Sequence, residues 1–270
     1  MIAQEIVDAK DRPGLWRLEH PSGLWAAAMV TEEYAGQFAL ADSVNRSEST
    51  NRDPKTRQWQ SSRFALRHLW ETGWQKGPMV GLGLDVQKQP SGKPYVLDPV
   101  GQALPLALAH TVGMGAAALV LQASILGIGV DVERLSDRFI KAWPRIASVP
   151  DWHQVCKAGL MNQEAEAATL IWVIKEACFK AALVQKSLFG QNQIIETINI
   201  ISKEGNLRWV GQVLSGEKDH KEILEFEAGC LNGVFGSNLN GVFGSKGISP
   251  KEIDNQEGLP WFWAVAWTNG

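Results

Sequence analysis

The chain has 270 residues, with 26 basic and 29 acidic side chains and a formal net charge of −3. This balance gives no electrostatic reason to expect a nucleic acid or an anionic membrane as a partner. Hydrophobic residues make up 45% of the chain and include 12 tryptophans, which is sufficient for the packed core of one or two domains.

The number and spacing of the cysteines indicate the redox state of the compartment in which the protein is expected to lie. Cys156, Cys178 and Cys230 are an odd number without metal-type spacing. This usage favours a reducing cytoplasm over a disulfide framework. The N-terminal segment contains Glu5, Asp8 and Asp11 and does not have the basic start of a secretory signal. We therefore expect a cytoplasmic protein.

In chain order, the first run that we single out covers residues 57–67, RQWQSSRFALR. Arg57, Arg63 and Arg67 would by default lie on the wet side of an amphipathic helix.

The segment 99–130 contains no Asp, Glu, Lys or Arg and is long enough on paper to span a bilayer. Polar residues and glycines interrupt it at short intervals, which argues against a membrane span. We expect three successive buried strands instead, over residues 106–109, 115–121 and 127–133.

The third of these strands carries two carboxylates. Ile128, Val130 and Val132 alternate with Gly129, Asp131 and Glu133. This is the period of a half-buried strand, so both carboxylates project to one face, about 7 Å apart along the backbone.

The run 171–181 predicts a helix, because its apolar residues fall at three- and four-residue steps. Lys175, Glu176 and Lys180 fall elsewhere, and Glu176 and Lys180 share a face one turn apart.

Taken together, Asp131, Glu133 and Glu176 are hard oxygen ligands of the kind that suits Mg²⁺, and the lysines beside Glu176 suit a phosphate. Each run alone has an ordinary structural explanation, as a solvated strand edge or a common helical sequence. It is their order and spacing that point to a site.

Two features near the end of the chain are structural predictions. The octad 231–238 is repeated over 239–246 with one change, and its Asn-Gly pairs predict a duplicated surface hairpin. Residues 261–267, WFWAVAW, alternate bulky and small side chains as a closing strand does.

The two charged runs resemble the 4′-phosphopantetheinyl transferases, whose pattern is G-[VI]-D, then roughly forty residues, then [FW]-[SCT]-x-K-E-[SA]-x-x-K. Here forty residues lie between Asp131 and Trp172, and Val173 is the departure from the second pattern. Glu133 completes the D-x-E of the larger, monomeric members, which are similar to the surfactin-synthetase activating enzyme.

The resemblance continues upstream. Gly92-Lys93-Pro94 matches the family's G-K/R-P, and residues 106–111 match a strand that ends in Ser-His-Ser/Thr, with Ala109 in place of the serine. The predicted helix over 57–67 resembles the family's R-x-F-x-x-x-R-x-L-x-R.

The resemblance implies an α/β (α+β) fold of two similar halves related by a pseudo-twofold axis, with coenzyme A in the cleft between them. The N-terminal half would be residues 1–124 and the C-terminal half residues 125–270. The implied reaction transfers the 4′-phosphopantetheine arm of coenzyme A to a serine of an apo acyl or peptidyl carrier protein, releasing 3′,5′-ADP. The enzyme would act as a monomer.

The resemblance also implies roles for single residues. Mg²⁺ would be held by Asp131, Glu133 and Glu176, and Lys175 and Lys180 would add positive charge at the pyrophosphate. The 3′-phosphate would be held by Arg57, Arg63, Lys93 and His110. The base would be Glu176 or a metal-bound water held by Asp131.

Two other readings stay open. A non-catalytic relative could use the same cleft to bind a carrier protein or a nucleotide. A different Mg²⁺-dependent phosphoryl enzyme would need its own phosphate loop, and no G-x-x-x-x-G-K-[ST] occurs.

Overall fold

The computed structural model describes residues 4–8, 14–36, 54–73, 84–98, 100–122, 124–157, 164–183, 193–203, 206–217, 220–231 and 260–269. The octad repeat, apart from Leu231, lies outside these ranges, and the hairpin predicted there stays a prediction. The chain divides into two compact units, Met1–Val132 with Asn269–Gly270 and Glu133–Thr268. The halves 1–124 and 125–270, as functional divisions, stay a prediction.

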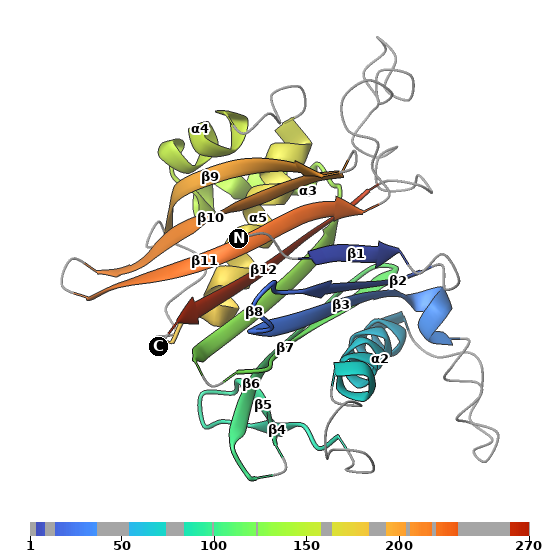
Figure 1. The fold of residues 1–270 in the computed structure, drawn as a ribbon. Helices are drawn as coiled ribbons and strands as arrows, with labels where there is room; N and C mark the ends of the chain where they lie inside the picture. Colours follow the sequence, from blue (N-terminus) through green and yellow to red (C-terminus); the bar gives the residue numbers. More distant parts are fainter. Residues whose placement is uncertain are drawn as a thin grey trace. The chain divides into compact units, whose positions relative to one another are not determined.

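The architecture is mixed α/β, with two antiparallel sheets and helices, and this confirms the expected class (Figure 1). The seven-stranded sheet has the order β1-β2-β3-β7-β6-β5-β4. Its strands are β1 (Gln4–Asp8), β2 (Leu15–Glu19), β3 (Trp25–Thr31), β4 (Gln87–Lys88), β5 (Pro94–Leu97), β6 (Ala103–Thr111) and β7 (Met114–Val120).

One helix packs on this sheet. The helix α2 (Pro54–Gly73) lies against β3, β6 and β7. Its buried residues Ala65, Leu66 and Leu69 form a core with Leu106 and Leu119 of the sheet. The predicted helix over 57–67 is confirmed, and it is longer than its motif.

The five-stranded sheet has the order β8-β12-β11-β10-β9. Its strands are β8 (Ile125–Arg134), β9 (Gln193–Lys203), β10 (Asn206–Glu217), β11 (His220–Leu231) and β12 (Trp261–Asn269). The predicted strands over 106–109, 115–121, 127–133 and 261–267 correspond to β6, β7, β8 and β12 and are confirmed.

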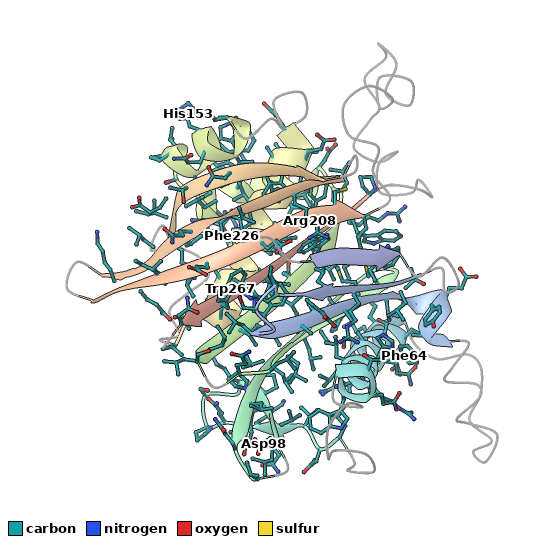
Figure 2. The ribbon with its side chains drawn as sticks, viewed as in Figure 1. Phe64, Asp98, His153, Arg208, Phe226 and Trp267 are labelled. Carbon is teal, nitrogen blue, oxygen red and sulfur yellow. The ribbon has the colours of Figure 1, made fainter. Side chains whose placement is uncertain are left out.

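Three helices lie beside the strands β9, β10 and β11 (Figure 1). They are α3 (Arg138–Ile146), α4 (Val149–Lys157) and α5 (Glu164–Ala181). On the sheet, the core residues Leu224, Phe226 and Ala228 alternate with residues of the other face. Arg208 belongs to that other face, since its pairing partner is Gly229. Figure 2 shows Arg208 and Phe226 on these neighbouring strands.

The uncharged segment 99–130 forms strands. It contributes β6, β7 and the first part of β8. Among the described residues, no helix combines the length and the apolar character that crossing a bilayer requires.

Candidate functional site: two carboxylate runs and an arginine helix

Asp131 and Glu133 lie near the end of β8 in different surroundings. Asp131 is 4% exposed, and the strand is buried on both faces from Gly127 to Val132. The expectation of a half-buried strand is therefore wrong at Asp131, because the alternation of residue types separates two faces without showing what covers them. Glu133 is half-buried, and its Oε2 accepts a hydrogen bond of 2.6 Å from Nη2 of Arg138, at the start of α3.

Glu176 and Lys180 lie on α5, and the predicted helix is confirmed. Nζ of Lys180 is 3.5 Å from Oε1 of Glu176, and about a quarter of each side chain is exposed. An i, i+4 pair of this kind adds only about 0.3–0.5 kcal/mol to helix stability. The pair by itself therefore holds the two side chains in place only weakly.

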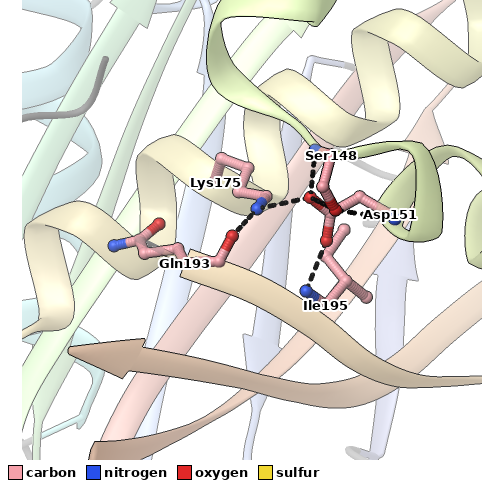
Figure 3. A network of polar contacts seen from close by, with 5 residues as sticks. All are labelled: Ser148, Asp151, Lys175, Gln193 and Ile195. Atoms are coloured by element: carbon pink, nitrogen blue, oxygen red, sulfur yellow. Dashed lines mark hydrogen bonds and ion pairs between the residues drawn. The ribbon is translucent and has the colours of Figure 1, made fainter. Parts of the chain in front are cut away.

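Lys175, adjacent to Glu176, is buried, unlike Glu176 and Lys180. Its side chain is 2% exposed, and its Nζ lies 3.0 Å from Oδ2 of Asp151, whose side chain is fully buried (Figure 3). The same ammonium donates to the backbone carbonyl of Gln193 on β9. Burial lowers the pKa of Lys175, and the Asp151 carboxylate opposes that shift. The sequence pattern places Lys175 outside the apolar stripe of its helix, whereas the structure places it in the interior.

Two properties of the three carboxylates bear on the expected magnesium site: the chemistry of their donor atoms and their grouping in the structure. The oxygen donors of Asp131, Glu133 and Glu176 are of the type that Mg²⁺ prefers. In the part of the chain that the structure describes, no three or more His, Cys, Asp or Glu side chains form a group that could hold a metal ion. The donor set thus fits Mg²⁺ in kind, and the structure does not bring these three residues together as a metal cluster.

Two of the expected coenzyme A contacts, Arg57 and Arg63, lie on α2. Nε of Arg57 is 3.7 Å from Oε2 of Glu32, and Oε1 of Glu32 accepts a hydrogen bond of 2.9 Å from the Gly113 amide. The guanidinium of Arg63 lies 5.1 Å from the ring centre of Trp59, and burial lowers its pKa. Trp59 itself is 53% exposed.

His110 lies at the end of β6 where α2 crosses the sheet. It pairs with Gly115 of β7, and a Cβ on Gly115 would lie 2.2 Å from the backbone nitrogen of Ser62. The glycine therefore lets the helix backbone approach the strand closely. Because Arg63 follows Ser62, the structure brings the middle of the arginine helix to the strand pair that carries His110.

Lys93 lies between β4 and β5. Its carbonyl accepts a hydrogen bond of 2.8 Å from the Gln89 amide. It precedes β5, which pairs with β6, the strand of His110. The assignments of Lys93, His110, Arg57 and Arg63 to a 3′-phosphate stay predictions.

Asp151 is the residue of this region that the sequence analysis does not identify. Ser148 and Asp151 form a reciprocal capping box at the start of α4: the Asp151 amide donates to Ser148 Oγ at 3.2 Å, and the Ser148 amide donates to Asp151 Oδ2 at 2.6 Å. The S-x-x-D spacing in the sequence predicts that cap. The bond from Asp151 to a lysine 24 residues later has no local signal.

The comparisons with known proteins concern the segment that carries both charged runs. The family model described as the 4′-phosphopantetheinyl transferase superfamily matches residues 127–228. That range contains Asp131, Glu133, Glu176 and Lys180. No curated protein matches the chain. The match confirms the resemblance over residues 127–228: this segment is similar to the 4′-phosphopantetheinyl transferase superfamily.

Proposed function

We propose that the protein transfers the 4′-phosphopantetheine arm of coenzyme A to a serine of an apo acyl or peptidyl carrier protein and releases 3′,5′-ADP. The observation that carries this proposal is the superfamily match over residues 127–228, which includes both charged runs. We further propose the larger, monomeric subtype, acting in the cytoplasm, with two halves related by a pseudo-twofold axis. Glu133, which completes the D-x-E pattern, supports that subtype.

In the proposed reaction the carrier serine oxygen attacks the phosphorus that bears the pantetheine arm. The new bond joins the serine oxygen to that phosphorus, and the bond to the oxygen of 3′,5′-ADP breaks with its electron pair. The serine proton must leave at the same time, and Glu176, partly exposed on α5, is the proposed acceptor. A water held by Asp131 is the alternative acceptor.

The residues of the chain have separate proposed tasks around this step. Lys180 holds positive charge beside the pyrophosphate, and its Glu176 partner can release it at small cost. Arg57, Arg63, Lys93 and His110 bind the 3′-phosphate, remote from the reacting bond. Asp131, Glu133 and Glu176 would hold Mg²⁺, which when bound neutralises charge on the departing 3′,5′-ADP.

A non-catalytic relative that binds a carrier protein or a nucleotide is the second candidate. One observation favours it: Glu133 and Glu176 each have a cationic side chain of the same protein as a partner, Arg138 and Lys180. A binding module of this fold could use such pairs for stability alone.

Incubation with Mg²⁺, coenzyme A and a panel of apo carrier proteins, followed by intact mass measurement, separates the two candidates. Transfer adds one phosphopantetheine arm to the carrier mass and requires Mg²⁺. If coenzyme A binds by calorimetry and no carrier gains mass, the enzymatic proposal fails and the binding module stands.

A further inference from the structure

The buried pair of Asp151 and Lys175 connects three elements of one unit. Lys175 comes from α5, Asp151 from the first turn of α4, and two further partners, Gln193 and Ile195, from β9 (Figure 3). Oδ1 of Asp151 accepts a hydrogen bond of 2.5 Å from the Ile195 amide, and Oδ2 accepts from the Ser148 amide and hydroxyl at 2.6 and 2.9 Å. The carboxylate is thus held by four donors, one of which is the lysine.

These contacts make Lys175 unsuited to a substrate phosphate. For its ammonium to reach a ligand it would have to leave Asp151, and the carboxylate would stay buried without its counter-ion. Breaking one partner out of a buried ion pair is strongly unfavourable, because an uncompensated charge remains in the interior. Lys180, five residues later on the same helix, has about a quarter of its side chain exposed.

The helix that carries the pair is buried on nearly every side. Every residue from 165 to 171 is buried, and so are Val173, Ile174, Ala177 and Cys178. A helix that is buried all round has no single apolar stripe to fix its rotation about its own axis. A buried polar pair that specifies register is the best-attested use of such groups.

The rotation of α5 decides where Glu176 and Lys180 point. With side chains, a helix has a radius of about 5–6 Å, so a rotation of about 10° moves a side-chain end by about 1 Å. A misplacement of about 1 Å can lower a rate by about 100-fold. Glu176 directly follows Lys175, so a fixed Lys175 fixes its direction.

From these contacts we propose that Asp151 and Lys175 are positioning residues, which hold α5 in the rotation that presents Glu176 and Lys180. This inference rests on the proposed function for its catalytic consequence, and it assigns Lys175 to the interior in place of the pyrophosphate.

The test compares Lys175→Met, Asp151→Asn and the double variant in the carrier assay. The double variant removes both charges together, a change that folded proteins tolerate well. We expect kcat to fall about 10- to 100-fold in all three, with KM for coenzyme A within about 3-fold of the parent. The double variant should be no worse than the worse single variant, because the two residues act as a unit.

A phosphate ligand gives a different pattern. Lys175→Met would then raise KM for coenzyme A, Asp151→Asn would leave kcat and KM unchanged, and the two effects would add. That pattern overturns the proposal.

The matched control is the buried pair Arg208 and Glu227, 2.9 Å apart and on the sheet face away from the helices. Arg208→Met with Glu227→Gln also removes a buried ion pair, but one that joins the strands β10 and β11. It should change the melting temperature without changing kcat. An equal loss of kcat in this control means that general destabilisation explains the result, and it overturns the positioning role.

A spectroscopic readout separates this proposal from the proposed function. Trp172 lies on α5 one turn before Glu176, with its ring 5.0 Å from that of Phe139. In protein labelled with 5-fluorotryptophan, the ¹⁹F resonance of Trp172, assigned through Trp172→Phe, should shift in Lys175→Met and stay in place in the control pair. If the parent modifies no carrier, the proposed function fails, and this shift still tests the rotation of α5. An unmoved resonance overturns the proposal.

Discussion

Asp131 and Glu176 share a functional group and differ in their surroundings. Asp131 is 4% exposed on β8, whereas about a quarter of the Glu176 side chain is exposed on α5. Under the proposed function, Asp131→Asn and Glu176→Gln each remove a charge and keep the shape. We expect each to lower the transfer rate on the order of 100-fold or more. Intact mass time courses measure the rate, and thermal unfolding should show a folded protein in each case.

Glu164→Gln is the control for these variants, because Glu164 is an exposed carboxylate at the start of the same helix. Its transfer rate should match the parent. Full activity of either Asp131→Asn or Glu176→Gln would remove that residue from the proposed site.

His110→Ala and Lys93→Ala test the proposed 3′-phosphate contacts. Both residues are remote from the reacting bond in the proposal, so their loss removes binding energy equally from the ground and transition states. KM for coenzyme A should rise while kcat changes little, and the 3′-dephospho analogue should be affected less. Equal losses for the two substrates contradict the assignment.

At single positions, the sequence predicts which residues share a helical face better than it predicts which residues are buried. It identifies Glu176 and Lys180 as neighbours on one helical face, and the structure has them paired. The interior position of Lys175 depends on Asp151, and a contact between residues 24 apart has no local pattern. Val173, the departure from the family pattern, is fully buried, and valine suits that place.

Among the elements, α2 depends on a glycine of β7. A Cβ on Gly115 would lie 2.2 Å from Ser62 N and 2.4 Å from Ser61 C, which are backbone atoms that cannot turn aside. Gly115→Ala should therefore lower the free energy of unfolding by about 1–3 kcal/mol as α2 is displaced. Urea unfolding measures this loss. Gly36→Ala is the control, since no described residue other than its chain neighbours lies within 4 Å of the added Cβ there, and a loss of similar size in the control would contradict the steric explanation.

Glu166, in the first turn of α5, should make the stability of the protein depend on pH. Glu166 is 4% exposed, its Oε1 has no hydrogen-bond partner among the described residues, and burial raises its pKa from 4.5 to about 7. The folded protein therefore binds this proton more tightly than the unfolded chain does. The contribution of Glu166 to stability is fully present below about pH 4.5, falls as the pH rises to about 7, and changes no further above that.

Glu166→Gln should remove this decline and make the protein more stable than the parent above pH 7, by at most about 3 kcal/mol. Urea unfolding at pH 5 and pH 8 measures the difference. Glu164→Gln, at an exposed position in the same first turn, should keep the parent's pH dependence. If the stability of the parent changes between pH 5 and pH 8 in the same way as that of Glu166→Gln, the proposed role of Glu166 is contradicted.

The elements of the chain differ in how far sequence predicts them. The strands β6, β7 and β8 follow from an uncharged segment divided by glycines, and α5 follows from apolar steps of three and four. The sequence analysis does not predict β9, β10 and β11, although Leu224, Phe226 and Ala228 alternate with Glu225 and Glu227. The pairing of these strands is a tertiary property, and alternation alone does not fix it.

For the molecule as a whole, the octad repeat permits a clean deletion. Leu231 is the buried last residue of β11, and Leu239 begins the second copy. Deletion of 231–238 and deletion of 232–239 yield the same sequence, so a leucine follows Cys230 in either case. Because the cost of closing a connection depends only weakly on its length, cooperative unfolding and carrier transfer should stay unchanged. Thermal unfolding and the mass assay measure these, and a loss of carrier selectivity with coenzyme A binding intact would make the repeat a docking element.

The interior position of Lys175 also determines whether this lysine reacts with amine-specific reagents in the folded protein. An acylating ester needs an accessible amine, and the Lys175 side chain is 2% exposed while that of Lys180 is 25% exposed. The two lysines of one motif, which look alike in the sequence, should therefore be labelled very differently. A peptide map after brief acylation should therefore show little label on Lys175 as long as α5 is folded in place. A lower labelling of Lys180 in the presence of coenzyme A would indicate that coenzyme A occupies the proposed site.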